Sequence, residues 1–153
     1  MNLIDQNDER GNWWEALRIW EKLANWTRCI KSESEFRHHS KMLLICLWNE
    51  KDWLKAQYTT KHKEIELYID NSKYICIAAD LANTIKHRTL TKFQRSTASQ
   101  TNFYGRVTVG NGKTRRMYYI ADGKGGHLEI LQILRGSLDE FEVLHHLLLS
   151  NQI

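Results

Sequence analysis

The sequence contains no proline among its 153 residues. Because proline breaks helix interiors, its absence suits long helices joined by tight connections. No stretch of the chain approaches the ~20 apolar residues that cross a bilayer. The polar and acidic N-terminus, MNLIDQNDERGNWW, also differs from a secretory signal. From these absences we expect a cytoplasmic protein that does not enter a membrane.

Cysteine is scarce, with only Cys29, Cys46 and Cys76, each among apolar neighbours. An odd number of widely spaced cysteines without a C-x-x-C pair is typical of buried thiols in a reducing compartment. The sequence also lacks a Gly-rich phosphate loop before a helix, a GxSxG motif and an HExxH motif. The adjacent histidines of each His-His pair would face different sides of a helix, so they predict no metal site. We expect neither a metal nor a cofactor.

What is present is the composition of a soluble globular chain, with 42% hydrophobic and 26% charged residues. Its length predicts one domain, residues 1–153. The charge is uneven. From Lys86 to Lys124 there are nine Lys or Arg residues and one acid, Asp122, a local charge of +8, so the rest of the chain sums to −4 of the total +4. A charge asymmetry of this kind can mark a surface that binds phosphates or an acidic partner. It can equally be an ordinary solvated face.

Apolar residues recur with a helical period in the first half of the chain. The pattern predicts helices over 12–30, 34–57, about 60–71 and 73–88. Asn12 is the expected N-cap of the first helix, and Ser32 with Glu35 has capping-box spacing before the second. The centre of the second helix, MLLICLW, is apolar all round, which predicts a helix buried in the middle of a bundle.

After His87 the pattern changes to a polar loop and then to strand-like runs. Asn111-Gly112 between GRVTV and KTRRMYYIA predicts a β-hairpin, and HLEILQIL after DGKGG predicts a third strand. Ser137 with Glu140 has capping-box spacing at the start of a last helix. The expected fold class is α+β. Its parts are a bundle of about four helices over 1–92, a loop and three-stranded antiparallel meander over 93–136, and a C-terminal helix over 137–153.

One stripe of the predicted helix over 73–88 is polar. Asp80, Asn83 and His87 stand at positions i, i+3 and i+7, which share a helix face. A catalytic interpretation gives His87 proton transfer, Asn83 phosphate positioning and Asp80 orientation of the imidazole. The structural interpretation is a hydrogen-bonded network that fixes how this helix meets its neighbour.

The segments NEKDWL (49–54) and ICIAADLANTIKHRTL (75–90) together resemble small bacterial proteins related to HEPN domains, the higher-eukaryote and prokaryote nucleotide-binding helical bundles. The resemblance covers roughly residues 34–92. Catalytic members carry the motif R-N-x-x-x-H, and the matching window here runs from Ala82 to His87. Asn83 and His87 match, whereas Ala82 replaces the arginine. The resemblance implies a helical dimer in an accessory or defence-type setting. In ribonuclease members it implies RNA cleavage without metal by the arginine and histidine of two protomers.

Three further residues are candidates for binding beside this stripe. Lys86 lies next to it, and Asp52, on the helix predicted over 34–57, could pair with Lys86 or His87. Arg37, followed by two histidines, could face the stripe and replace the missing cation, or could be an ordinary polar residue near a helix start. A lysine or a displaced arginine does not reproduce the bidentate fork of an arginine in the motif position.

The basic segment supplies the remaining binding candidates, Arg106, Arg115 and Arg116, on strands that also carry tyrosines. Basic strands with interleaved aromatic residues are typical of surfaces that track phosphates and stack bases, although tyrosine is also an ordinary strand former. The leading hypothesis is a non-catalytic binding or dimerisation module for RNA or nucleotide, acting as a homodimer. The alternatives are a metal-independent ribonuclease that uses His87, and a protein–protein interaction module whose polar stripe is purely structural.

Overall fold

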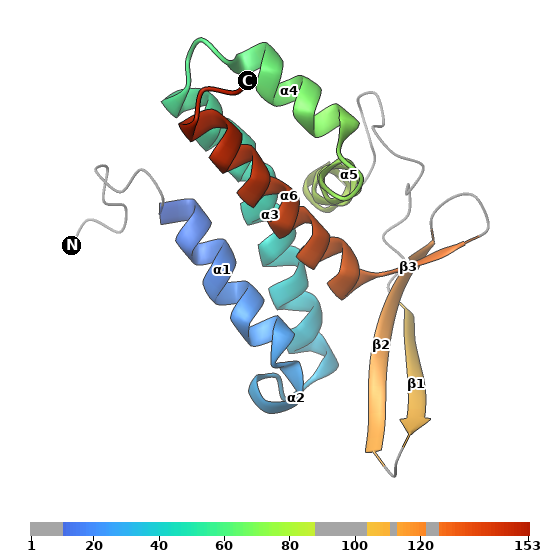
Figure 1. The fold of residues 1–153 in the computed structure, drawn as a ribbon. Coiled ribbons are helices and arrows are strands. Elements are labelled where there is room, and N and C mark those ends of the chain that lie inside the picture. The colour runs from blue at the N-terminus through green and yellow to red at the C-terminus, as the bar shows by residue number, and fades with distance from the viewer. Residues whose placement is uncertain (1–10, 88–103, 111–112, 122–125) are drawn as a thin grey trace.

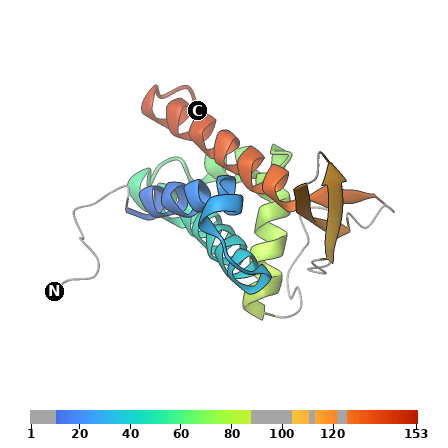
Figure 2. The same ribbon diagram turned by 90° about the horizontal axis from the view of Figure 1, so that it is seen from below.

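The computed structural model describes residues 11–87, 104–110, 113–121 and 126–153; for His87, 104–110, 113–118 and Ala121 it describes the backbone alone. Within these residues the chain forms a bundle of helices with a small antiparallel sheet at one end and a long C-terminal helix (Figure 1). Viewed from below, the helices gather on one side and the strands on the other (Figure 2). The predicted combination of a helical bundle, a small sheet and a C-terminal helix is confirmed.

The first predicted helix is divided in two. α1 (Gly11–Ala24) ends before Asn25, and the single turn α2 (Trp26–Cys29) follows. Asn25 donates its side-chain amide to the Glu21 carbonyl at 3.0 Å, which takes up a carbonyl at the end of α1. The prediction that Asn12 caps this helix is wrong. Asn12 lies inside the first turn, and its side chain reaches across to another helix.

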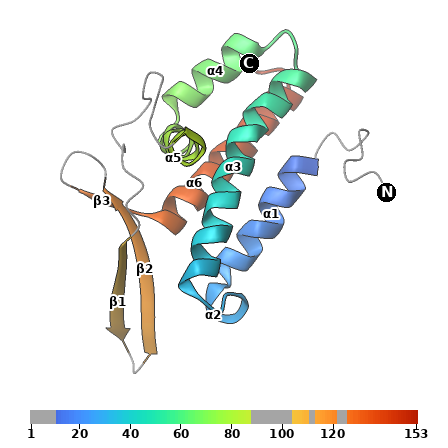
Figure 3. The same cartoon turned by 180° about the vertical axis from the view of Figure 1, so that it is seen from behind.

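The second predicted helix, α3 (Glu33–Gln57), agrees with the prediction within one residue. Ser32 is its N-cap, and the Ser32 hydroxyl accepts the Glu35 amide at 3.1 Å. The Glu35 carboxylate in turn accepts the Lys31 amide at 2.9 Å. In Figure 3, α1 and α5 flank α3 on opposite sides, so α3 is the central helix of the bundle. Its central position explains the buried side chains at Leu43, Leu44 and Leu47.

α4 (His62–Asn71) and α5 (Ile75–His87) are the two further predicted helices. Ser72 joins them: its hydroxyl donates to the Ile69 carbonyl at 2.6 Å and accepts the Cys76 amide at 3.2 Å. Glu140 supplies the rest of the cap of α5 from a distant part of the chain. Its carboxylate accepts the Tyr74 and Ile75 amides, each at 2.9 Å. A carboxylate at a helix N-terminus satisfies free amides and complements the helix dipole.

The sheet has the order β1-β2-β3, and its three strands differ greatly in length. β1 (Tyr104–Gly110) and β2 (Lys113–Ala121) pair antiparallel along their length, whereas β3 (His127–Glu129) pairs with the end of β2 at three positions. The hairpin of β1 and β2 extends away from the helices (Figure 1). The predicted turn at Asn111-Gly112 lies outside the described residues.

The predicted third strand is wrong beyond Glu129, because α6 (Ile130–Leu149) begins there. Glu129 is the N-cap of α6, and its carboxylate accepts the Gln132 amide at 2.8 Å. Ser137 is therefore an interior residue of α6 and not a cap. Its hydroxyl donates to the Ile133 carbonyl at 2.8 Å. Glu140, the predicted partner of Ser137 in a capping box, instead caps α5.

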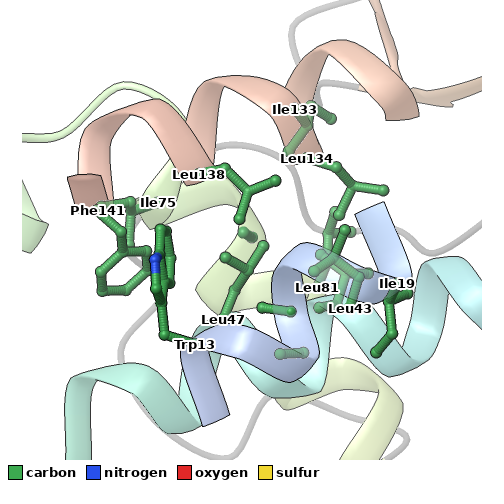
Figure 4. Close-up of a cluster of buried hydrophobic side chains, with 14 of the residues drawn as sticks. Trp13, Ile19, Leu43, Leu47, Ile75, Leu81, Ile133, Leu134, Leu138 and Phe141 are labelled. Atoms are coloured by element: carbon green, nitrogen blue, oxygen red, sulfur yellow. The ribbon is translucent and has the colours of Figure 1, made fainter. Parts of the chain in front are cut away.

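The hydrophobic core forms where α1, α3, α5 and α6 meet. Figure 4 shows side chains from these helices converging, with Trp13 next to Phe141. The rings of Trp13 and Phe141 have centroids 6.4 Å apart. Ile120 of β2 is fully buried and belongs to the same core, so the base of the sheet is anchored on the bundle. Within the described residues, no helix is long and apolar enough to span a membrane.

Gly136 makes a close helix contact, since a Cβ atom there would lie 2.2 to 2.6 Å from ring carbons of Tyr74. We expect Gly136→Ala to lower the free energy of unfolding by about 1–3 kcal/mol, because the Tyr74 ring must move out of its place against α6. Urea denaturation measures this loss.

Tyr74→Ala provides the control. In that background Gly136→Ala is expected to be neutral or stabilising, because alanine is favoured over glycine in a helix interior by about 1 kcal/mol. Equal losses in both backgrounds would contradict the assigned contact.

Candidate functional site

The predicted polar stripe on α5 is withdrawn from solvent at Asp80 and less so at Asn83. Asp80 is buried, with 1% of its surface exposed, and Asn83 is half-buried. Thr84 donates its hydroxyl to the Asp80 carbonyl at 2.8 Å, a bond within the helix. His87 ends α5, and its side chain lies outside the described atoms. Of the three predicted catalytic residues, Asp80 is thus withdrawn from solvent.

Ala82, at the arginine position of the motif, lies in the core with no exposed surface. A side chain that began there would enter the cluster formed by Leu81, Ala78 and their neighbours on other helices. The arginine of the motif is therefore absent from the sequence, and the position that it would hold on α5 is also buried. A side chain at that position would not reach solvent, where RNA would have to bind.

Cys76 lies one turn before Asp80 on the same stripe and could be taken for a nucleophile. Burial raises the pKa of the Cys76 thiol, and the charge of the nearby Asp80 raises it further. The thiol also donates to the Lys73 carbonyl at 3.4 Å. A nucleophilic cysteine requires the opposite shift, because the thiolate is the reactive form. The α5 stripe therefore lacks an activated thiol.

The two segments that carry the family resemblance do meet in space. Lys86 of α5 donates to the Asn49 side chain of α3, with Nζ and Oδ1 3.4 Å apart. The predicted pairing of Asp52 with Lys86 is not found. Asp52 is mostly exposed, and the Lys51 ammonium lies 3.9 Å from its carboxylate. Asn49 is thus the contact that sequence reasoning missed, because the acid three residues later was the more obvious partner for a lysine.

Arg37 lines a surface hollow of about 440 Å³ formed by the first turns of α3. His38 and Lys41 line it too, and the Arg37 guanidinium donates to Glu33 at 2.8 Å. Arg37 stands twelve residues before Asn49, which corresponds to about 18 Å of helix. The predicted role of Arg37 as a replacement cation for the α5 stripe is not supported by this position.

Backbone register relates the predicted basic residues of the hairpin to one another. Thr108 pairs with Arg115, and Arg106 pairs with Met117 two residues along β1. Directly paired residues and alternate residues share a face of a sheet. Arg106 and Arg115 therefore occupy same-face positions, whereas Arg116, paired with Val107, belongs to the other face.

That face can be placed relative to the core. Tyr119 has the same parity as Arg115 along β2 and is half-buried, whereas the next residue, Ile120, is fully buried. Since neighbouring residues of a strand alternate between faces, the Arg106 and Arg115 positions lie on the face opposite to the one that Ile120 packs into the core.

A buried polar cluster joins α1, α3 and α6, and sequence reasoning did not find it. The Glu50 carboxylate lies 3.0 Å from Nε2 of His145 and accepts the Asn12 amide at 2.6 Å. The same Asn12 amide donates to the Cys46 carbonyl at 2.9 Å. Trp13 meets the imidazole edge-on, with ring centroids 4.5 Å apart. This Glu50–His145 cluster ties the N-terminal end of α1 and the C-terminal part of α6 to α3.

The burial of the Glu50–His145 cluster favours a structural role over a catalytic one. The side chains of Glu50 and His145 are 6% and 11% exposed, which leaves a substrate no approach to the imidazole. Burial, followed by the charges of Glu15 and Glu50, raises the pKa of the neighbouring Cys46 thiol to about 11. Cys46 therefore stays protonated near neutral pH. Cys29, in contrast, is exposed, so the expectation that all three cysteines are buried is wrong.

A sequence signal for this cluster exists. Glu50 follows Leu47 by three residues and precedes Leu54 by four, so it is an acid within the apolar stripe of α3. His145 likewise lies within an apolar stripe of α6, four residues after Phe141 and three before Leu148. A charged residue inside an apolar stripe needs a buried partner. The sequence does not say which partner, because the two residues are 95 positions apart.

In the described part of the chain, no group of three His, Cys, Asp or Glu residues could hold a metal ion. Comparison with known proteins gives no further guide, since no family model, no curated protein and no solved structure matches the chain.

Proposed function

We propose that the protein is a non-catalytic binding module, acting as a homodimer, that holds single-stranded RNA through the phosphates along its basic hairpin. The observation that carries the proposal is the separation of charge. Residues 86–124 sum to +8 and the remainder to −4, and the hairpin within the basic segment extends away from the helices (Figure 1). A projecting basic element attracts a polyanion at long range while the acidic bundle does not.

The register of the hairpin supports this assignment. Arg106 and Arg115 hold same-face positions together with Tyr104 and Tyr119, which pair directly. Cations that track phosphates and aromatic rings that stack on bases are the two components of a sequence-tolerant single-strand surface. The face is also the one opposite to buried Ile120, so binding there needs no opening of the core.

The experiment compares binding of labelled single-stranded RNA by fluorescence anisotropy in EDTA. We expect Arg106→Gln/Arg115→Gln to bind about tenfold more weakly than wild type, because two phosphate contacts are lost. The matched control is Arg18→Gln/Arg135→Gln, which removes the same charge from exposed positions on the bundle. Equal weakening by both double variants would contradict a hairpin site.

The same protein and RNA samples also test the two alternative functions. A metal-independent ribonuclease that uses His87 would cleave the RNA in EDTA, and His87→Ala would abolish cleavage. We expect the RNA to remain intact with both proteins, because the arginine position of the motif is buried at Ala82. A protein–protein interaction module would bind no RNA at all, and His87→Ala would then change only the melting temperature.

A further inference from the structure

The cations of the hairpin are unevenly divided between its two faces. Directly paired residues and alternate residues share a face of the ladder. Arg106, Arg115 and Lys113 therefore hold positions on one face, whereas Arg116 belongs to the face that Ile120 continues into the core. We call the first of these the cationic face. From the base of the hairpin to its tip, the pairs on this face are Tyr104–Tyr119, Arg106–Met117, Thr108–Arg115 and Gly110–Lys113.

The three cations of this face follow one another at nearly equal steps. Arg106 and Arg115 are diagonal neighbours across the ladder, and such positions lie about 7–8 Å apart. Arg115 and Lys113 are alternate residues of β2, which lie about 6.8 Å apart. Consecutive phosphates of an extended single strand are separated by a similar distance. A strand that runs from the base of the hairpin to its tip can therefore meet the three cations with three consecutive phosphates.

The base of the hairpin suits a nucleobase better than a phosphate. Tyr104 and Tyr119 pair directly there, one step before Arg106, and Tyr119 is half-buried. Glu129 of β3 pairs with Tyr119 on its other side, and the Glu129 carboxylate accepts the Gln132 amide. This carboxylate repels a phosphate beside the tyrosines but not an uncharged base. Aromatic side chains offer such a base a stacking platform.

We propose that the cationic face holds about four nucleotides of single-stranded RNA, with consecutive phosphates at Arg106, Arg115 and Lys113 and one terminal base stacked at Tyr104 and Tyr119. The length follows from the three cations, because three phosphates link four nucleosides. The inference rests on the proposed function and gives its site a length and an order from base to tip. It also gives Lys113 a binding role that Arg116 does not share.

The salt dependence of binding tests the division of the cations between the faces. The ligand is a labelled oligouridylate of about twelve nucleotides, and we expect Lys113→Gln to make the logarithmic slope shallower by about 0.7, because one phosphate contact is lost. Arg116→Gln is the matched control. It removes the same charge from the other face of the same hairpin and should leave the slope as in wild type. Equal changes in both variants would overturn the one-sided track.

A series of oligouridylates from two to about eight nucleotides tests the length of the site. Affinity should rise steeply up to four nucleotides, because each added phosphate meets a further cation. Beyond that length it should grow only with the number of positions at which the oligonucleotide can be placed. An affinity that keeps rising steeply past four nucleotides contradicts a site with three phosphate positions.

An abasic nucleotide at either end of the tetranucleotide tests the stacking platform. Loss of the base at one end should weaken binding by wild type about fivefold or more, whereas loss at the other end should have little effect. Tyr104→Leu should remove this difference, and circular dichroism checks that the variant melts as wild type does. Equal affinities of the two abasic ligands for wild type, or a difference that persists in the folded variant, would overturn the platform.

The outcomes distinguish this inference from the proposed function. If Arg106→Gln/Arg115→Gln binds RNA as wild type does, the hairpin is not the site, and both fail. If that double variant binds weakly while Lys113→Gln behaves as Arg116→Gln does, the hairpin site stands. Only the order of phosphates and base along the cationic face is then overturned.

Discussion

Ala82→Arg, which completes the R-N-x-x-x-H motif, is expected to unfold the protein and not to create a ribonuclease. Ala82 has no exposed surface. A buried, unpaired guanidinium costs several kcal/mol, and its volume adds the cost of overpacking. The total stability of a domain is about 5–15 kcal/mol, so this single change removes much of it. Circular dichroism melting and the soluble yield measure the loss.

Ala56→Arg is the control for this prediction. It introduces the same side chain into α3 at an exposed position, and we expect a melting temperature close to that of wild type. If Ala82→Arg instead folded as wild type does and cleaved RNA, the α5 stripe would have to be accessible in solution, and the catalytic interpretation would replace ours.

Glu50→Ala is expected to lower the free energy of unfolding by about 3–5 kcal/mol, because it breaks a buried pair and leaves the His145 imidazole without its partner. The double-mutant cycle with His145→Ala isolates the interaction. We expect a coupling energy of roughly 1–3 kcal/mol, since each single change already removes the contact. Urea denaturation of the four proteins supplies the values.

The Arg135–Asp139 pair on α6 offers a matched comparison. Its Nε–Oδ1 distance is also 3.0 Å, but its side chains are 62% and 57% exposed. An exposed pair four residues apart on a helix contributes about 0.3–0.5 kcal/mol. A Glu50–His145 coupling as small as that of the exposed pair would show that the cluster does not hold α6 to α3.

The helices of the first half could be predicted because their signals are local. The apolar period and the Ser32–Glu35 spacing place α3 within one residue of its observed start. The start of α6 could not be predicted in the same way. HLEILQIL is a short apolar run that suits a buried strand as well as a buried helix. In the structure Glu129, which is not among the preferred N-cap residues, caps α6, and Tyr74, distant in the sequence, lies against Gly136 of the same helix.

The candidate site likewise has one part that the sequence predicts and another that it does not. The sequence correctly places Asp80 and Asn83 on one helix, because the apolar period predicts that helix and their spacing puts them on one face of it. It does not reveal that Asp80 is buried, since burial depends on how other helices pack around α5. The Glu50–His145 contact is invisible for the same reason, although each residue interrupts an apolar stripe and so signals an unknown partner.

The central claim is that the basic hairpin binds RNA through phosphates, and the salt dependence of the association constant tests it most directly. The logarithm of this constant should fall linearly with the logarithm of salt concentration, with a slope of about −0.7 for each phosphate neutralised on a single strand. For the wild type we expect a slope of roughly −2 or steeper, and for Arg106→Gln/Arg115→Gln a slope shallower by about 1.4. A flat line for the wild type, or the same slope for both proteins, would contradict the account.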